Sequence, residues 1–374
     1  MKTEFNFAQD AVDRRKFSVF RQTCWIALLV AAITLGRVDR AAAQSQGGAV
    51  FLSIAGASDT RISLPYQQAP VDSGGVTAIS ANSLTLSGKS WSSNQFAYKA
   101  GQQPQTYYAE FFTGALQGAF YTIIANDGDT LVLDTKGDDL TNHPLGEIAS
   151  GDLVKVTPYW TVAGVFGATQ SDLILDPRTS PIFAKDDVLL FDNNLPGSNK
   201  APSTTLYFLV GKGWTSVAAP SDSTADVVIP PGSVMVVRRR NTAPAALVNM
   251  GLYGPQRRAI YVHGATATSA NDQYVSLALP EPLTLNEANL AGAVVKASAN
   301  SVFRNDEVLV WRNNTPGFNT PANTTLFYQT ASGWLQVGNS DPIGDSFLLQ
   351  PGEAIIIRKK QNNAAVNWLQ MPPQ

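Results

Sequence analysis

The sequence predicts an all-β protein built from duplicated antiparallel β-sandwich or barrel units, with a small β-barrel-like region inserted in the first half. The first observation is an internal repeat, because residues 186–241 align without a gap with residues 306–361, and 17 of the 56 positions are identical. A random pairing would match at about one position in fifteen. The second observation is the abundance of turn formers, 29 glycines and 22 prolines. The third is a series of short apolar runs rich in β-branched residues, which are typical of strands.

Each half opens with the same pattern of a strand, a small-residue turn and a second strand. In the first half we expect strands at residues 49–54 and 62–64, before Pro65. The second half repeats the pattern from residue 259 to residue 277, shortly before Pro280. Proline cannot donate to a ladder, so it ends these strands.

The halves differ by a surplus of roughly residues 74–167 in the first, which we interpret as an insertion with its own β structure. Residues 76–86 predict two strands with a turn at Asn82, and residues 119–133 predict a hairpin around Asp127-Gly128. Asp-Gly is a strong signal for a tight hairpin turn. Several short strands at this spacing indicate a small barrel or sandwich.

The repeated segments contain apolar runs that do not alternate with polar residues. A strand with one face in water alternates with period two, whereas a strand covered on both faces need not. We therefore expect central strands of a packed sandwich or barrel at these runs, which are residues 188–191, 206–210, 234–237, 308–311 and 354–357.

The chain divides into an export signal, residues 1–43, a first β unit, residues 44–246, and a second β unit, residues 247–374. Basic residues precede an apolar run from Cys24 to Leu35, and small residues at 41–43 suit a signal peptidase. The sequence leaves open the general secretory route or the twin-arginine route, because Asp13–Phe17 partly resembles a twin-arginine motif. We expect an exported protein of the periplasm, the outer surface or the extracellular space.

Composition excludes several functional classes. Without residues 1–43 the chain carries 20 Lys and Arg against 25 Asp and Glu, a net charge of −5 that argues against nucleic acid as a partner. The only cysteine, Cys24, lies in the predicted signal, so the mature chain has no disulfide. The apolar run in that signal is too short for a spanning helix, and we expect no transmembrane span in the mature chain.

The search for catalytic chemistry finds no motif, so we predict no enzyme, no catalytic residue, no cofactor and no metal. The only histidines are His143 and His263. His143 lies near Asp138, Asp139 and Glu147, but this spacing matches no known ligand pattern. A hydrolase with carboxylates far apart in sequence is the remaining enzymatic alternative.

The candidate ligand-binding residues come from two repeated features. The NNxPGxN segments supply Asn193, Asn194, Asn199, Asn313, Asn314 and Asn319, and a tryptophan follows a glycine in each copy at Trp214 and Trp334. Asn, Pro and Gly explain a structural turn, but a loop on a rigid sheet also suits a ligand. The tryptophans suit core packing or platforms for sugar rings. The basic strand ends at residues 238–240 and 358–360 suit edge protection or contact with an anion.

Residues 58–70, 95–134 and 151–167, together with the paired NNxPG repeats, resemble an uncharacterised family of secreted β-rich proteins that is multiplied in verrucomicrobial genomes. The resemblance covers most of the mature chain. It implies secretion and a β-rich fold, and it carries no activity and no functional residues.

The sequence thus favours an exported non-enzymatic β-rich protein that serves as a surface, matrix or interaction component. Its partner is unknown, with a polysaccharide or an envelope protein as the candidate classes. The alternative is a carbohydrate-binding module that uses Trp214, Trp334 and the Asn-rich loops.

Overall fold

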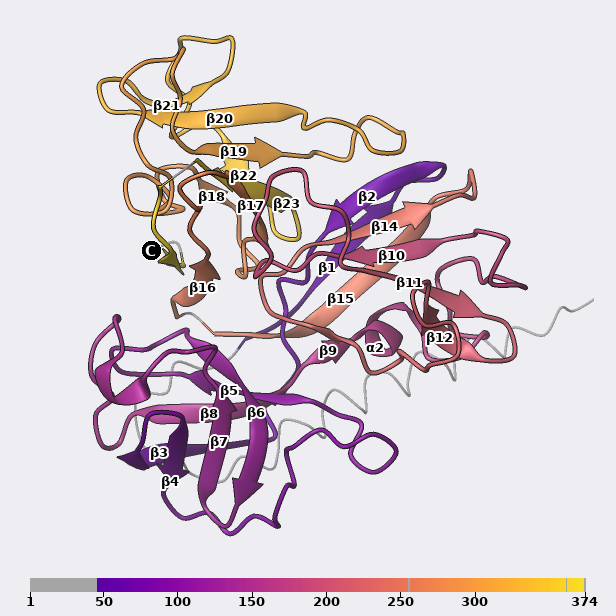
Figure 1. Cartoon of the computed structure of the whole chain (residues 1–374), viewed down its shortest axis with the longest axis vertical. Helices are drawn as coiled ribbons and strands as arrows, with labels where there is room; N and C mark the ends of the chain where they lie inside the picture. Colours follow the sequence, from indigo (N-terminus) through magenta and orange to yellow (C-terminus); the bar gives the residue numbers. More distant parts are fainter. Residues whose placement is uncertain (1–45, 255, 361, 373–374) are drawn as a thin grey trace, which may run out of the picture. The chain divides into compact units, whose positions relative to one another are not determined.

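The computed structural model describes residues 46–254, 256–360 and 362–372 (Figure 1). These residues are nearly all in strands, turns and loops, which confirms the predicted all-β class. The predicted signal, residues 1–43, lies outside the described residues.

The first unit contains a five-stranded antiparallel sheet with strand order β12-β11-β10-β14-β2. Two-stranded ribbons, β1 with β15 and β9 with β13, complete the unit together with a short helix. The bounds of its elements are β1 (Gln46–Ile54), β2 (Ser58–Ile62), β9 (Trp160–Thr161), α2 (Val162–Phe166), β10 (Asp187–Leu190), β11 (Thr204–Leu209), β12 (Gly213–Ser216), β13 (Val228–Ile229), β14 (Met235–Arg239) and β15 (Ala245–Tyr253).

The second unit has the same arrangement, a five-stranded sheet of order β17-β23-β19-β20-β21 and ribbons β16 with β24 and β18 with β22. Equivalent residues also share the register, since Val188 pairs with Leu206 and Val308 pairs with Leu326. The bounds are β16 (Arg258–Val262), β17 (Asn271–Ser276), β18 (Leu283–Thr284), β19 (Glu307–Val310), β20 (Thr324–Gln329), β21 (Gly333–Gln336), β22 (Leu348–Leu349), β23 (Ala354–Lys359) and β24 (Val366–Gln370). Shared order and register are what a duplication would produce, and the duplication itself stays a prediction.

Between β2 and β9 the chain forms a closed six-stranded barrel, drawn from indigo to magenta in Figure 1. This confirms the β-barrel-like region expected in the first half. The strand order is β3-β4-β7-β6-β5-β8, with bounds β3 (Asp72–Ile79), β4 (Ser83–Leu86), β5 (Tyr107–Phe111), β6 (Phe120–Asp127), β7 (Thr130–Asp134) and β8 (Leu153–Pro158), and a 3-10 turn, η1 (Leu140–Asn142), precedes β8.

The hydrophobic cores explain why the apolar runs of the repeat do not alternate. One face of each five-stranded sheet shares a core with its own ribbon, since Val188 and Ile54 belong to one cluster and Val308 and Trp368 to another. A further cluster joins the units through the other faces, and its members are Val234, Tyr274, Trp311, Ala354 and Ile356 with the partly buried Phe191, Leu309 and Ala322. Both faces are therefore covered, which is the condition that non-alternating strands predict.

Two local expectations differ from the structure. The second strand of the first half is Ser58–Ile62, because these residues pair with β14, whereas Ser63 leaves the sheet and its N–H donates to the carbonyl of Gly352. β15 pairs with β1 along its whole length up to Tyr253, so the expected unit boundary after residue 246 falls inside a strand.

Candidate functional site

The loop Asn193–Asn199 of the first unit docks on β17 of the second. The Asn193 side chain imitates a strand backbone, because its Nδ2 donates to the carbonyl of Tyr274 at 3.0 Å and its Oδ1 accepts from the Tyr274 N–H at 2.9 Å. Further along, the Asp272 N–H donates to the carbonyl of Gly197 at 2.9 Å, and the Asn199 N–H donates to Asp272 at 2.7 Å.

The loop Asn313–Asn319 of the second unit makes the same contacts with β2 of the first. The Arg61 N–H donates to Asn313 Oδ1 at 3.0 Å, and Asn313 Nδ2 donates to the Arg61 carbonyl at 2.8 Å. The Asp59 N–H donates to the carbonyl of Gly317 at 3.0 Å, and the Asn319 N–H donates to Asp59 at 2.8 Å. The two loops and two strands thus form a reciprocal clamp between the units.

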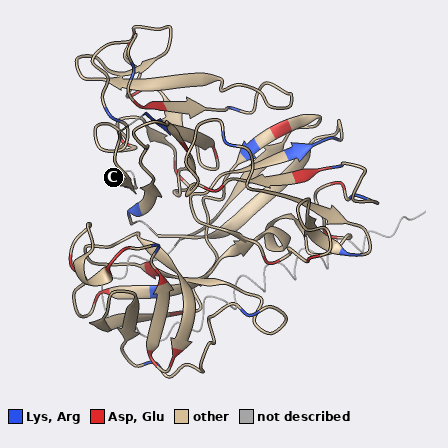
Figure 2. Cartoon of the chain, viewed as in Figure 1, with Lys and Arg blue, Asp and Glu red and all other residues tan. Residues whose placement is uncertain are grey.

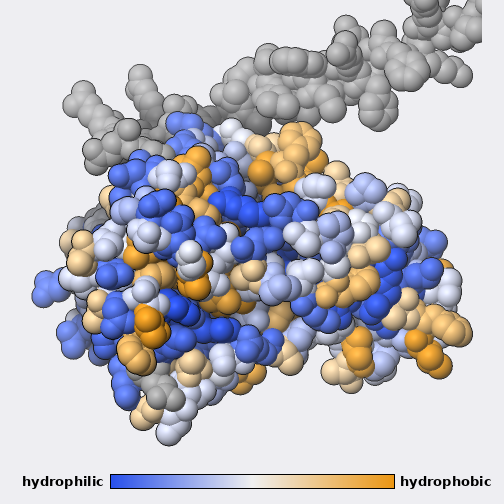
Figure 3. All heavy atoms as spheres, turned by 90° about the horizontal axis from the view of Figure 1, so that it is seen from above, coloured by the Kyte–Doolittle hydropathy of each residue, from blue (hydrophilic) through white to orange (hydrophobic). Residues whose placement is uncertain are grey.

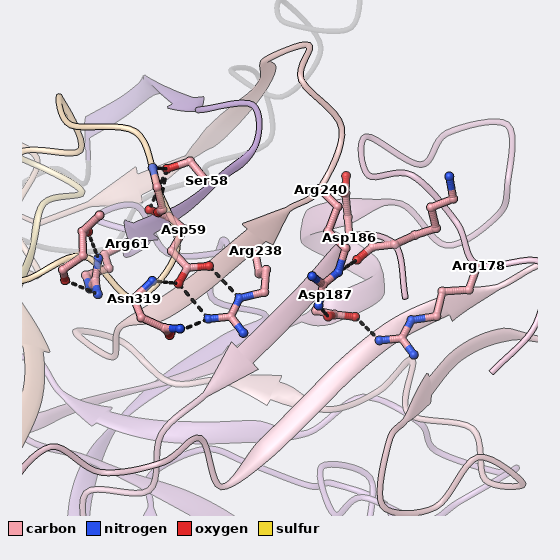
Figure 4. Close-up of polar contacts among 12 residues, drawn as sticks. Ser58, Asp59, Arg61, Arg178, Asp186, Asp187, Arg238, Arg240 and Asn319 are labelled. Atoms are coloured by element: carbon pink, nitrogen blue, oxygen red, sulfur yellow. Dashed lines mark hydrogen bonds and ion pairs between the residues drawn. The ribbon is translucent and has the colours of Figure 1, made fainter. Parts of the chain in front are cut away.

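A buried carboxylate and an arginine complete each side of the clamp. Arg238 Nε donates to Asp59 and Arg358 Nε donates to Asp272, both at 2.7 Å. The same guanidinium groups reach the loop of the other unit, because Arg238 donates to Asn319 Oδ1, as Figure 4 shows, and Arg358 donates to Asn199 Oδ1. The clamp is therefore a charge-assisted network rather than a simple turn.

Burial alone would raise the pKa of Asp59. The hydrogen bonds from Arg238 and from the Asn319 N–H, together with the Arg238 charge, outweigh that effect and lower the pKa below its ordinary 3.8. Arg238 and the Asn319 N–H therefore keep the Asp59 carboxylate in its charged form.

The predicted asparagines divide into two groups. Asn193, Asn199, Asn313 and Asn319 use backbone or amide groups in the clamp, whereas Asn194 and Asn314 are exposed at the loop tips. Asn194 donates only to nearby Asp192, and Asn314 accepts from nearby Asn323. The contacts of the first group suit the structural interpretation of the loops, and ligand binding by any of the six stays a prediction.

Both predicted tryptophans lie in the cores, with exposed fractions of 2% for Trp214 and 1% for Trp334. Trp214 Nε1 donates to the carbonyl of Gly167 at 2.7 Å. Trp334 Nε1 has no hydrogen-bond partner among the described residues. Neither ring offers a face to solvent, so a sugar-binding surface would have to use other residues.

The basic strand ends fold back onto acidic residues at the start of β10 and β19. Arg239 forms a buried ion pair with Asp186 at 2.6 Å, and Lys359 forms one with Asp306 at 2.9 Å. Figure 2 shows the basic end of β14 beside the acidic start of β10. The inner cations of the two runs are therefore engaged inside the protein, and only their outer neighbours, Arg240 and Lys360, keep side chains that are 39% exposed.

His143 belongs to a buried polar chain in the barrel. Its Nδ1 accepts from the Leu145 N–H at 3.1 Å, which leaves the proton of the neutral ring on Nε2, 2.8 Å from the Tyr121 hydroxyl. That hydroxyl donates to Asp138 at 2.8 Å. Burial lowers the pKa of His143, and the Asp138 carboxylate opposes the shift only in part. Among the described residues no group of three or more His, Cys, Asp or Glu could hold a metal ion.

A small cleft lies between the barrel, the end of β15 and the start of β16, and it is lined by Glu110, Phe112, Lys155, Tyr253 and Arg258 among others. Glu110 forms a buried ion pair with Arg258, and the Lys155 ammonium lies 3.2 Å from the centre of the Phe112 ring. Burial lowers the pKa of Lys155 to about 8. Glu110 is the only carboxylate in the cleft lining, whereas glycoside hydrolysis commonly uses two.

The structure brings forward a feature that sequence reasoning missed, two exposed apolar pairs at equivalent places in the repeat. Ile182 and Phe183 are 85% and 68% exposed, and Val302 and Phe303, 120 positions later, are 73% and 79% exposed. The signal was present in the sequence as apolar residues at matching positions of two loops, directly before the repeated β10 and β19 segments. We call Ile182–Phe183 and Val302–Phe303 the apolar pairs.

No family model, no curated protein and no solved structure matches the chain. In the part of the chain that the structure describes, helices are all too short to cross a membrane.

Proposed function

We propose that the chain is an exported, non-enzymatic interaction protein that binds an envelope protein through its two apolar pairs. The observation that supports this most strongly is the presence of exposed, bulky apolar residues at equivalent positions of both units. Single exposed apolar residues are common on protein surfaces, whereas here two bulky ones stand next to each other on each of two equivalent loops.

Each apolar pair is held by an equivalent arginine anchor, although the arginines come from different places in sequence. Arg178 forms an ion pair with Asp187 and donates to the Pro181 carbonyl at 3.0 Å. Arg304 forms an ion pair with Glu307, and its Nη1 donates to the Ser301 carbonyl at 2.8 Å. Anchored loops lose little conformational entropy on binding, which favours a recognition role.

The surroundings of the apolar pairs indicate the charge of the partner. Lys185, two residues after Phe183, is exposed, and Arg240, whose side chain is 39% exposed, donates to the Lys185 carbonyl. Arg304 directly follows Phe303, and it shares the buried Glu307 with Lys360, whose side chain is 39% exposed. Exposed basic side chains therefore lie beside both apolar pairs, so the fitting partner has an apolar pocket with an acidic rim.

On the face shown in Figure 3, hydrophobic residues occur in separate patches between hydrophilic ones.

The carbohydrate-binding alternative draws no support from Trp214 and Trp334, because both rings are buried.

The test is binding of the purified chain to envelope proteins, with the captured partner then purified and titrated against variants. We expect Phe183→Asp and Phe303→Asp each to weaken binding at least tenfold. Each change removes the apolar contact of an interface anchor and places a charge in the apolar pocket of the partner. Leu195→Asp is the matched control, since Leu195 is 53% exposed on a different loop.

Equal binding by all three variants, or capture of a glycan and no protein, would contradict the proposal. Turnover of a substrate by the chain would contradict its non-enzymatic part.

A further inference from the structure

We infer that the free edge of β1 pairs with β1 of a second copy of this chain, which forms a symmetric dimer. The inference uses a different surface from the proposed function and rests on it only for export, because cleavage after Ala43 shortens the segment before β1. β1 pairs with β15 on one side over nine residues, and no backbone hydrogen bond joins its other edge to any described residue. An unpaired strand edge is a template for another strand.

β1 lacks the features by which proteins commonly block such edges. Its sequence, QGGAVFLSI, contains no charged residue and no proline, and its pairing with β15 is regular without a bulge. Charged side chains, prolines and bulges are the usual protections of an edge strand. The corresponding strand of the second unit, β16, is only five residues long and begins with Arg258.

The outer face of the β1–β15 ribbon is also apolar and uncovered. Phe51 is 77% exposed, Met250 63% and Val248 39%, and Phe51 lies opposite Val248 in the ribbon. In the second unit the barrel covers part of the matching face, because Ala259 is buried in the barrel core and its N–H donates to the carbonyl of Gly118 at 3.2 Å, although Tyr261 stays 47% exposed. The ribbon of the first unit therefore has the same kind of surface without the cover.

A second copy fits this surface better than an unrelated strand. An antiparallel β1–β1 pairing is symmetric, and the absence of charge in β1 means that it brings no like charges together. A register centred on Val50 places Phe51 opposite Ala49 of the other copy, so the two ribbons become one four-stranded sheet with a continuous apolar face. The predicted cleavage after Ala43 leaves only two residues before β1, too few to obstruct the edge.

The test is sedimentation velocity over a range of protein concentrations, on chain processed by its host and with its N-terminus determined by mass spectrometry. We expect a dimer for the natural sequence and a monomer for Phe51→Lys, with the dissociation constant raised at least tenfold. Tyr261→Lys, at the matching exposed position of β16, is the control and should remain dimeric; Tyr261 is 47% exposed. Circular dichroism establishes that both variants are folded.

A second variant tests the register. In a chain with Cys24 replaced by Ser, Val50→Cys should form an intermolecular disulfide under mild oxidation, because the two Val50 positions face each other in the proposed pairing. A natural sequence that stays monomeric at about 100 μM, where even a weak specific interface would be populated, overturns the inference. Loss of the dimer in both lysine variants, or its retention in Phe51→Lys, also overturns it.

Discussion

At the scale of single residues, the two equivalent tryptophans share one sequence pattern but differ in the hydrogen bonding of their ring N–H groups. The Gly-Trp pattern predicts burial at both places, and both rings are buried. It does not reveal that only Trp214 finds a hydrogen-bond acceptor, because the acceptor, Gly167, follows α2 in the first unit. A buried donor without a partner costs about 1–3 kcal/mol.

The first prediction compares Trp214→Phe with Trp334→Phe. Both changes remove part of a buried ring, but only the first breaks a hydrogen bond, and the second removes an unpaired donor. We therefore expect Trp214→Phe to lower the free energy of unfolding by about 1–2 kcal/mol more than Trp334→Phe does. Urea unfolding followed by circular dichroism measures the difference, and an equal or larger loss in Trp334→Phe would refute this account.

At the scale of elements, the NNxPGxN loops act as a clamp between the units. The positive φ angles of Asn199, Asn313 and Asn319, which are 50°, 53° and 53°, favour asparagine at these positions. Sequence reasoning identified this turn chemistry correctly. It could not identify the strand on which each loop docks, because Asp59 and Asp272 are distant in sequence from their partners and carry no local signal.

The second prediction uses neighbouring asparagines of one loop. Asn193→Ala removes two hydrogen bonds and leaves the buried Tyr274 N–H without its partner, so we expect a loss of about 1–3 kcal/mol in the free energy of unfolding. Asn194→Ala, at the exposed tip, should stay within about 0.5 kcal/mol of the natural chain. Chemical denaturation of both variants checks the contrast, which a comparable loss in Asn194→Ala would contradict.

In the inserted barrel, too, the sequence predicted some strands and missed another. Residues 76–86 and 119–133 predicted its hairpins, and the structure has β3–β4 and β6–β7 there. β5, Tyr107–Phe111, was not predicted, because its sequence YYAEF includes Glu110, which is buried only through its ion pair with Arg258 of the second unit. The pattern of neighbouring residues cannot reveal an ion-pair partner that lies far away in the sequence.

At the scale of the whole molecule, two buried networks make stability depend on pH in different ranges. Burial lowers the pKa of His143 below its ordinary 6.5, so the unfolded chain takes up the proton first and stability falls as the pH drops below about 6.5. Asp59 also has a lowered pKa, because its hydrogen bonds outweigh burial, so its contribution is lost below about pH 4.

The third prediction separates these two effects. His143→Gln keeps a side-chain donor near Tyr121 but does not titrate, so we expect a smaller fall in melting temperature between pH 7 and pH 5 than in the natural chain. The fall below pH 4 should remain, because Asp59 is unchanged. Thermal unfolding across this range measures both parts. His263, whose pKa burial also lowers, should contribute to the fall that remains between pH 7 and pH 5. An unchanged profile in His143→Gln would show that the barrel histidine is not responsible.

The reciprocal clamp also has a consequence for how the polypeptide can be divided. A break between Tyr253 and Arg258 would leave two fragments, each holding a loop whose receiving strand belongs to the other. The break would also separate Phe191 from Tyr274, whose rings stack with their centres 4.0 Å apart. Each half thus supplies a docking strand for the loop of the other, and we expect neither fragment alone to hold its loop in the conformation seen in the whole chain.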